Sequence, residues 1–199
     1  MTRRTTGRVA MPLRAALDVL REHRRPGDVV ITSMGSAREW MAMGPLDPLD
    51  FVYVPSSMGE APALGLGISL AQPARRVVAC SGDGSMLMNL GAFVTIASEA
   101  PPNLVLIVFD NGVYEVTGAQ PVPGRGVDFE AIARASGIGS VHRFSEIGAW
   151  RSGARDALGD AGPVCIVLDV QPVPGAVGPR SPGPTADRAS GFAAALRSR

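Results

Sequence analysis

The segment Val77–Gln120 constrains the fold more than any other part of this chain. An apolar run leads into Gly82-Asp83-Gly84-Ser85, a helical pattern follows, and a second apolar run ends at Asp110-Asn111-Gly112. The 25 residues from 85 to 109 are enough for one helix, one turn and one strand. Because the carboxyl ends of parallel strands meet at one edge of a sheet, Asn111 is expected beside Asp83.

These two residues and the glycine turn suit a metal diphosphate. A helix that opens on a glycine turn offers free backbone N–H groups and the positive end of its dipole to phosphate oxygens. Gly82 and Gly84 let the backbone approach closely. Asp83 offers a carboxylate oxygen and Asn111 an amide oxygen, and magnesium prefers a few such oxygens together with phosphate and water. A lone Gly-Asp-Gly is a weak signal, but the spacing to Asn111 favours a site over a purely structural turn.

Strand and helix patterns alternate along the rest of the chain. Strands are expected at 28–33, 51–54, 77–81, 104–109, 139–144 and 164–170, and helices at 11–25, 60–71, 85–99, 129–136 and 145–158. This order predicts a single α/β domain, a doubly wound and mostly parallel sheet with helices on both faces. In the helix at 60–71, Gly65 and Gly67 would allow a close approach to the sheet. In the helix at 85–99, the apolar stripe is expected at Leu87, Leu90, Val94 and Ala97.

Composition divides the chain into three regions. Residues 1–10 are basic and expected to be flexible, residues 11–170 form the domain, and residues 171–199 form a tail rich in proline, glycine and alanine, with a short helix at 186–196. Residues 117–127 are also rich in glycine and proline, which is typical of a loop that covers an active site.

Charge, hydropathy and cysteine spacing argue against several classes of protein. A net charge of +1 and 5% aromatic residues disfavour nucleic-acid binding. No apolar run approaches the length of about 18 residues of a membrane span, and the basic start is not followed by the apolar region of a signal peptide. Cys80 and Cys165 lie in apolar runs without a CxxC pattern, so we expect buried thiols, no iron–sulfur cluster and a cytoplasmic location.

Gly82-Asp83-Gly84, the interval after it and Asp110-Asn111 resemble the signature of the thiamine-diphosphate-dependent enzymes. That signature ordinarily ends in two asparagines, and here Asp110 takes the place of the first. The likeness runs from about residue 11 to 170 and is strongest between 55 and 120. Within the family, it is greatest to the β subunit of sulfopyruvate decarboxylase and the C-terminal part of phosphonopyruvate decarboxylase, through Ser57-Met58-Gly59 and Gly84–Gly91.

The resemblance implies the diphosphate-binding (PP) fold and a set of binding residues. Mg²⁺ would be held by Asp83, Asn111 and the main-chain oxygen of Val113. Met58 would hold thiamine diphosphate in its bent form, the alternative being an ordinary core methionine. The full set of expected cofactor-binding residues is Gly35, Ser36, Ser57, Met58, Gly59, Gly82, Asp83, Gly84, Ser85, Asn111 and Val113.

Three further residues are substrate candidates. Arg38 suits an anionic substrate because guanidinium pairs well with carboxylate or phosphonate; otherwise, Arg38 and Glu39 form an exposed helix start. Glu115 and Thr117 either face the substrate or belong to a mobile cover. Glu60 is assigned to the first turn of a helix, where the dipole favours an acid. We assign neither His23 nor His142 to catalysis.

The family also uses a glutamate that activates the cofactor and comes from a separate pyrimidine domain. This chain has room for one domain, so we expect no such catalytic residue here and an obligate pyrimidine-domain (α-type) subunit, in a hetero-oligomer such as α2β2 or larger. The function implied is decarboxylation of a small 2-oxo acid similar to sulfopyruvate or phosphonopyruvate. The alternatives are carboligation of the acyloin or acetolactate type, and a non-catalytic phosphate-binding regulatory module.

Overall fold

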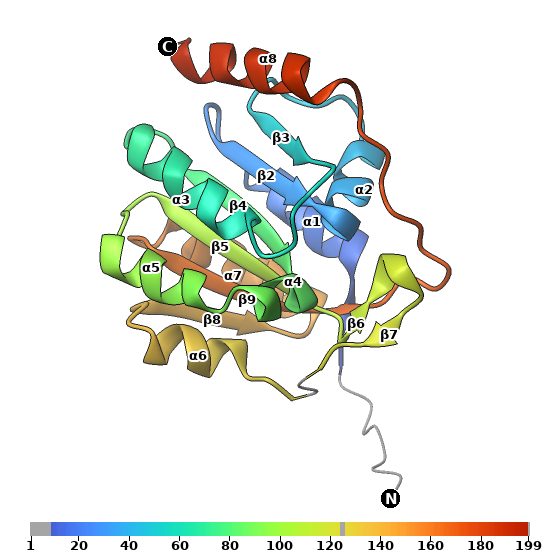
Figure 1. The fold of residues 1–199 in the computed structure, drawn as a ribbon. Coiled ribbons are helices and arrows are strands. Elements are labelled where there is room, and N and C mark those ends of the chain that lie inside the picture. The colour runs from blue at the N-terminus through green and yellow to red at the C-terminus, as the bar shows by residue number, and fades with distance from the viewer. Residues whose placement is uncertain (1–8, 124–125, 199) are drawn as a thin grey trace, which may run out of the picture.

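The structure is a computed structural model that describes residues 9–123 and 126–198. Residues 1–8 of the segment predicted to be flexible, 1–10, lie outside the described residues. A parallel sheet lies between two layers of helices (Figure 1). Within the described ranges, no helix is both long enough and apolar enough to cross a membrane.

The sheet has seven strands in the order β1-β9-β5-β4-β2-β3, with β8 also paired to β9. The strands are β1 (Met11–Pro12), β2 (Val29–Ser33), β3 (Asp50–Tyr53), β4 (Val77–Gly82), β5 (Leu104–Asp110), β8 (Ser140–Phe144) and β9 (Val164–Gln171). Each of their pairings is parallel. A small antiparallel hairpin of β6 (Val113–Tyr114) and β7 (Gln120–Pro121) encloses the 3₁₀ turn η1 (Glu115–Thr117).

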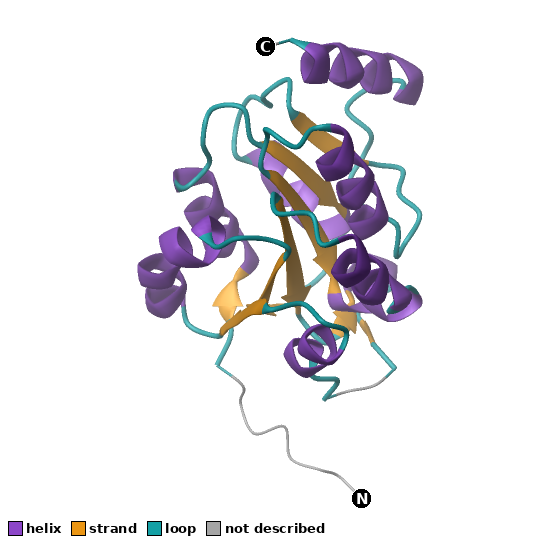
Figure 2. Cartoon of the chain, turned by 90° about the vertical axis from the view of Figure 1, so that its left-hand side faces the viewer, coloured by secondary structure: helices purple, strands orange, loops and turns teal. Residues whose placement is uncertain are grey.

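Helices cover both faces of the sheet, which confirms the predicted fold class (Figure 2). The helices are α1 (Leu13–Glu22), α2 (Met34–Ala42), α3 (Ala61–Ala71), α4 (Asp83–Met88), α5 (Gly91–Glu99), α6 (Phe129–Ala135), α7 (Ile147–Gly159) and α8 (Thr185–Arg197). One core cluster joins α1, α2 and α7 to the sheet and contains the buried Trp40 and Trp150. The other joins α3, α4, α5 and α6 to the opposite face.

The strand order changes direction between β2 and β4. From β2 the chain runs through α2 to β3, whereas from β4 it runs through α4 and α5 to β5 on the other side. In an open α/β sheet, the crevice beyond the carboxyl ends of such a strand pair is the usual place for a ligand. The residues at this crevice are those that follow Ser33 and Gly82.

Three sequence expectations about the interior are met, and one is not. All seven residues of β5 are buried, as expected for a central strand. Cys80 and Cys165 are buried free thiols. A Cβ on Gly65 would lie 2.7 Å from the Cβ of Ala79, so this glycine does allow α3 to approach the sheet. A Cβ on Gly67 would meet no atom within 4 Å, so the prediction that Gly67 also allows the helix to approach the sheet is wrong.

The single helix expected at 85–99 is wrong, because the chain forms α4 and α5 with a break at Asn89. Asn89 has φ −148° and ψ 63°, outside the helical region. Its side-chain amide donates to the Gly59 carbonyl at 3.3 Å. The break changes which positions face the core, so Phe93 and Ile96 are buried while Leu90 and Val94 of the expected stripe are 36% and 58% exposed.

The chain ends and one loop also differ from expectation. The first helix is shorter than 11–25, because residues 11 and 12 pair with β9 as a strand. The loop expected at 117–127 contains β7, and its residues 124 and 125 lie outside the described residues. In the tail, the predicted helix is present as α8, which packs beside β3: Phe192 lies 4.8 Å from Phe51 between ring centroids, and Arg188 donates to the Val52 carbonyl at 2.6 Å.

Candidate functional site

A cavity of about 470 Å³ lies at the switch point between β2 and β4. Its wall contains most of the residues predicted to bind the cofactor: Gly35, Ser36, Met58, Gly82, Asp83, Gly84, Ser85, Asn111 and Val113. Ser57 and Gly59 do not line it. Glu115 and Thr117 line it, whereas Arg38 lies behind Glu115.

Asp83 is the buried acid at the floor of this cavity. Its Oδ1 accepts the backbone N–H of Gly84 at 2.8 Å, and its Oδ2 accepts that of Gly112 at 2.7 Å. Burial raises the pKa of Asp83 to about 6, although these two hydrogen bonds act in the opposite direction and the nearby Asp110 adds to the rise. Each carboxylate oxygen keeps a further lone pair, so Asp83 can bind a cation as well as the loop.

Asn111 lies across the floor from Asp83, at the start of the loop after β5. Its Oδ1 accepts the backbone N–H of Val113 at 3.0 Å, and its Nδ2 donates to Glu115 Oε2 at 2.9 Å. The second bond fixes which end of the amide is the donor. Asn111 Oδ1, the oxygen that a metal would need, is therefore directed toward the backbone of Val113.

A partly buried ion pair extends this network to α2, and the sequence did not reveal it. Arg38 Nη2 donates to Glu115 Oε1 at 2.8 Å, and Arg38 Nε donates to Glu39 Oε1 at 3.0 Å. The Glu115 side chain is 7% exposed. Arg38 is thus engaged with two carboxylates and is not the start of an exposed helix. No sequence signal links Arg38 to Glu115, because they are 77 positions apart.

The two glycines of the motif differ in their surroundings. A Cβ on Gly84 would lie 2.4 Å from Tyr114 Cε1, so the β6–β7 hairpin packs directly over this glycine. A Cβ on Gly82 would meet nothing within 4 Å, which leaves its backbone open to the cavity. Gly82 therefore offers the close approach expected for a diphosphate, while Gly84 provides room for Tyr114.

The second wall of the cavity is the start of α2. Its first residue, Met34, has φ 50°, a conformation that is uncommon for a residue with a side chain and often found at functional sites. The Ser36 hydroxyl donates to the Ser33 carbonyl at 2.8 Å and accepts the Ser33 N–H at 3.1 Å. The first N–H groups of a helix lack partners within that helix, so this end of α2, at the switch point, favours an anion.

Other singled-out residues lie elsewhere. Glu60 is exposed and precedes α3, in agreement with its assignment to a helix start. The His23 ring lies 2.9 Å from the Val19 carbonyl, and His142 pairs with Asp160 at 2.8 Å; neither lines the cavity. Thr117 Oγ1 donates to Gln120 Oε1 at 3.0 Å within the hairpin.

The donor set of the cavity fits a magnesium diphosphate. One carboxylate and one amide oxygen come from neighbouring strand ends, together with open backbone at Gly82. Such hard oxygen donors, with ligand phosphates and water to complete the octahedron, match the preference of Mg²⁺. Among the described residues that line the cavity, the charged ones are Asp83 and Glu115.

Comparison with known families gives an independent result. Residues 31–168 match the family model described as "Thiamine pyrophosphate enzyme, C-terminal TPP binding domain". A crystal structure from Mycobacterium smegmatis, described as a thiamin diphosphate-dependent enzyme, superposes with a TM-score of 0.70 over 81% of this chain and 32% of that one. At 23% identity, this likeness concerns the fold.

Two curated relatives are more similar in sequence. Phosphonopyruvate decarboxylase of Streptomyces viridochromogenes is 39% identical over 165 residues, which make up 82% of this chain and 41% of that protein. Sulfopyruvate decarboxylase subunit beta of Methanothermobacter thermautotrophicus is 41% identical over 120 residues, 60% of this chain and 62% of that one. The chain thus spans less than half of the first relative and under two thirds of the second.

Proposed function

The chain belongs to the thiamine pyrophosphate enzymes, and on that premise we propose that it is the diphosphate-binding subunit of a two-component, Mg²⁺-dependent 2-oxo acid decarboxylase. The observation that carries the proposal is the joint placement of Asp83 and Asn111 at one cavity, with Gly112 bonded to Asp83. The relatives that are named decarboxylases support the reaction class. We propose residues 11–170 as the binding domain and residues 171–199 as its tail.

In this proposal, Asp83, Asn111 and the main-chain oxygen of Val113 hold Mg²⁺. The open backbone at Gly82 and the start of α2, with Gly35 and Ser36, receive the diphosphate. The Ser85 Oγ accepts the Gly59 N–H at 2.7 Å and so fixes the segment that carries Met58. Met58 lines the cavity and would support the cofactor ring.

Thiamine diphosphate supplies a ring that accepts the electrons released when a 2-oxo acid loses CO2. This chain supplies the binding and the dry surroundings. Much of the cavity wall is apolar, with Leu13, Met34, Met88 and Phe109 among its residues, so bound water would be displaced from the reacting region. Glu115 and Thr117, at the wall, and Arg38, behind Glu115, are the proposed substrate-side residues.

Two features of the cavity support the proposed partner subunit. Among the described residues, the acids of the lining are Asp83, proposed for the metal, and Glu115, which pairs with Arg38. The resemblance to the family implies that the activating glutamate comes from a pyrimidine-domain subunit, and this lining is consistent with that. Met88 lines the cavity and is nevertheless 54% exposed, and Leu90 and Val94, which follow it in the sequence, are also exposed apolar residues. In the proposal, these exposed apolar side chains contact the partner subunit.

Co-expression with a candidate pyrimidine-domain protein, followed by a CO2-release screen over 2-oxo acids, tests the proposal. We expect release that requires both proteins, Mg²⁺ and thiamine diphosphate, with sulfopyruvate and phosphonopyruvate as the first substrates to try. Formation of a new C–C bond from the same keto acid would assign carboligation instead. Mg²⁺-dependent cofactor binding without any turnover would favour the regulatory module, and absence of both binding and turnover would contradict the proposal.

A further inference from the structure

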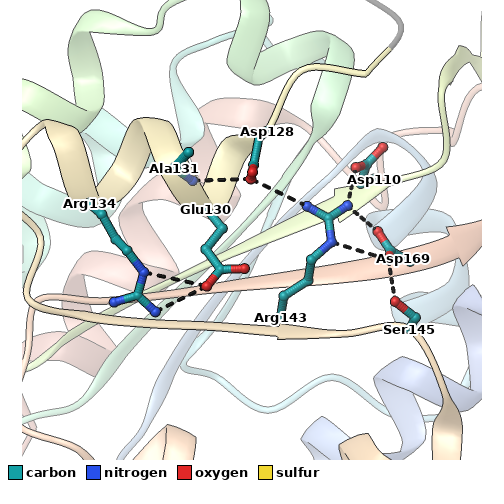
Figure 3. Close-up of polar contacts among 8 residues, drawn as sticks. All are labelled: Asp110, Asp128, Glu130, Ala131, Arg134, Arg143, Ser145 and Asp169. Carbon is teal, nitrogen blue, oxygen red and sulfur yellow. Dashed lines mark hydrogen bonds and ion pairs between the residues drawn. The ribbon is translucent and has the colours of Figure 1, made fainter.

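Behind the metal-site loop lies a cluster of charged residues that the proposed chemistry does not use. Arg143 of β8 reaches across β9 and contacts the carboxylates of Asp110 and Asp169, with Asp128 more distant at 3.9 Å (Figure 3). Its Nη2 donates to Asp110 Oδ2 at 2.8 Å and also to Asp169 Oδ1, and its Nε donates to Asp169 Oδ2 at 3.2 Å. Ser145 donates to the same Asp169. One guanidinium therefore holds together three adjacent strands at their carboxyl ends.

The register of the sheet explains why a cation is favourable here. Asp110 and Asp169 are direct partners across the parallel pair β5–β9. Their side chains are only 8% and 2% exposed, and the Arg143 side chain is 19% exposed. Two buried like charges at neighbouring positions repel each other, and a shared cation with good hydrogen-bond geometry offsets that repulsion.

The cluster is one peptide bond away from the proposed metal ligands. Asp110 is the last residue of β5, and Asn111, Gly112 and Val113 follow it directly. Gly112 bonds to Asp83, so the place where β5 ends also sets the position of this second ligand relative to the loop. Arg143 itself does not line the cavity of about 470 Å³.

We propose that Arg143 is a positioning residue, which fixes Asp110 against Asp169 and thereby holds the Asn111–Val113 loop in the geometry that binds Mg²⁺ and diphosphate. The expected effect of Arg143 on Mg²⁺ and cofactor binding rests on the proposed function. Its expected effect on the position of the Asn111–Val113 loop concerns this chain alone. The proposal also accounts for Asp110, which stands where the family signature ordinarily has an asparagine. The Asp110 carboxylate pairs with the Arg143 guanidinium, whereas a neutral asparagine would not need a cation.

Three substitutions and one control test the proposal. Arg143→Gln removes the charge, Arg143→Lys keeps the charge without the forked geometry, and Asp110→Asn removes the repulsion between residues 110 and 169. The control is Arg134→Gln: Arg134 pairs with Glu130 at 3.1 Å and donates to the Val141 carbonyl of β8, but it contacts neither Asp110 nor Asp169 in Figure 3, so it controls for the loss of an arginine that contacts the same strand. Thermal unfolding establishes first that each variant is folded.

The first measurement is amide hydrogen exchange of the full chain without metal or cofactor. We expect faster exchange at the Gly112 and Val113 amides in Arg143→Gln, and unchanged exchange in Arg134→Gln. This readout does not depend on the proposed function. Unchanged exchange at both amides in Arg143→Gln would overturn the inference even if the wild-type complex binds the cofactor.

The second measurement is the Mg²⁺ concentration for half-maximal thiamine diphosphate binding by the chain with its partner. Residues behind a metal ligand typically contribute about 10- to 100-fold to metal affinity, and we expect a loss in that range for Arg143→Gln, a smaller loss for Arg143→Lys and none for Arg134→Gln. The double variant Arg143→Gln/Asp110→Asn should recover most of the loss. A loss that Asp110→Asn does not relieve would contradict the role assigned to the Asp110 contact, whereas absence of binding by the wild type would contradict the proposed function.

Discussion

Gly112 donates its backbone N–H to Asp83 Oδ2 at 2.7 Å, so the loop after β5 is fastened to the carboxylate that follows β4. The bond can form because the spacing between Gly-Asp-Gly and Asp-Asn in the sequence brings the ends of β4 and β5 to the same edge of the sheet. It also places the expected metal ligands on one floor before any metal is bound. Substitutions and changes of pH at this floor and around it should therefore have separable effects on binding and on stability.

The pKa of Asp83 predicts how metal binding depends on pH. Burial raises this pKa to about 6, so the carboxyl is mostly protonated below pH 6 in the metal-free chain, and protons then compete with Mg²⁺. Calorimetry of Mg²⁺ and thiamine diphosphate binding should show affinity that falls about tenfold for each pH unit below about 6 and levels off above about 7. Affinity that is constant from pH 5 to 8 would contradict this assignment.

Gly84→Ala and Gly82→Ala should separate stability from binding. A methyl on Gly84 collides with the Tyr114 ring, so we expect about 1–3 kcal/mol of lost stability in urea unfolding. A methyl on Gly82 meets nothing in the chain, so its stability should stay within about 0.5 kcal/mol of wild type. Gly82→Ala should nonetheless weaken cofactor binding. Equal stability loss in both variants would show that the hairpin does not pack as described.

Gly65 and Gly67 of α3 form a second matched pair. Gly65→Ala forces a Cβ against Ala79 at 2.7 Å and should destabilise by about 1–3 kcal/mol. Gly67→Ala meets nothing, and an alanine in a helix interior should stabilise by about 0.5–1 kcal/mol. The two changes in urea unfolding free energy should therefore have opposite signs. The same sign for both would mean that α3 does not approach β4 as closely as the structure shows.

Arg38 and Glu115 should behave as a coupled pair. Arg38→Met leaves the buried Glu115 carboxylate without its cation, and we expect a loss of up to about 3 kcal/mol in unfolding free energy. Arg38→Met/Glu115→Gln should recover much of that loss, with a coupling energy of about 0.5–3 kcal/mol. Arg151→Met, which breaks a pair of exposed side chains with Glu22, should cost less than about 1 kcal/mol. Strictly additive effects of the two changes at 38 and 115 would contradict the pairing.

The parts of this molecule that depend on local pattern were predictable from sequence. The apolar run of β5 and the alternation of strands with helices both follow from short-range rules. The placement of Asp83 near Asn111 followed from the same alternation, because it needs only the strand order.

The parts that depend on contacts between distant segments were not predictable. Asn89 ends α4 beside Gly59, which lies 30 positions earlier, and periodicity carries no information about such a contact. Arg143 meets Asp110 across 33 positions, and Arg38 meets Glu115 across 77. The sequence links neither arginine to its acidic partners, and only the folded arrangement shows that both are partly buried and paired.

The most direct test of the metal-diphosphate site is calorimetric titration of thiamine diphosphate into the chain with its pyrimidine-domain partner, with and without Mg²⁺, for wild type and Asp83→Ala. Glu60→Gln is the matched control, because Glu60 is an exposed acid outside the cavity lining. We predict Mg²⁺-dependent binding in wild type and Glu60→Gln, and its loss in Asp83→Ala. Binding that does not require Mg²⁺, or that is unchanged in Asp83→Ala, would contradict the metal-diphosphate site at the ends of β4 and β5.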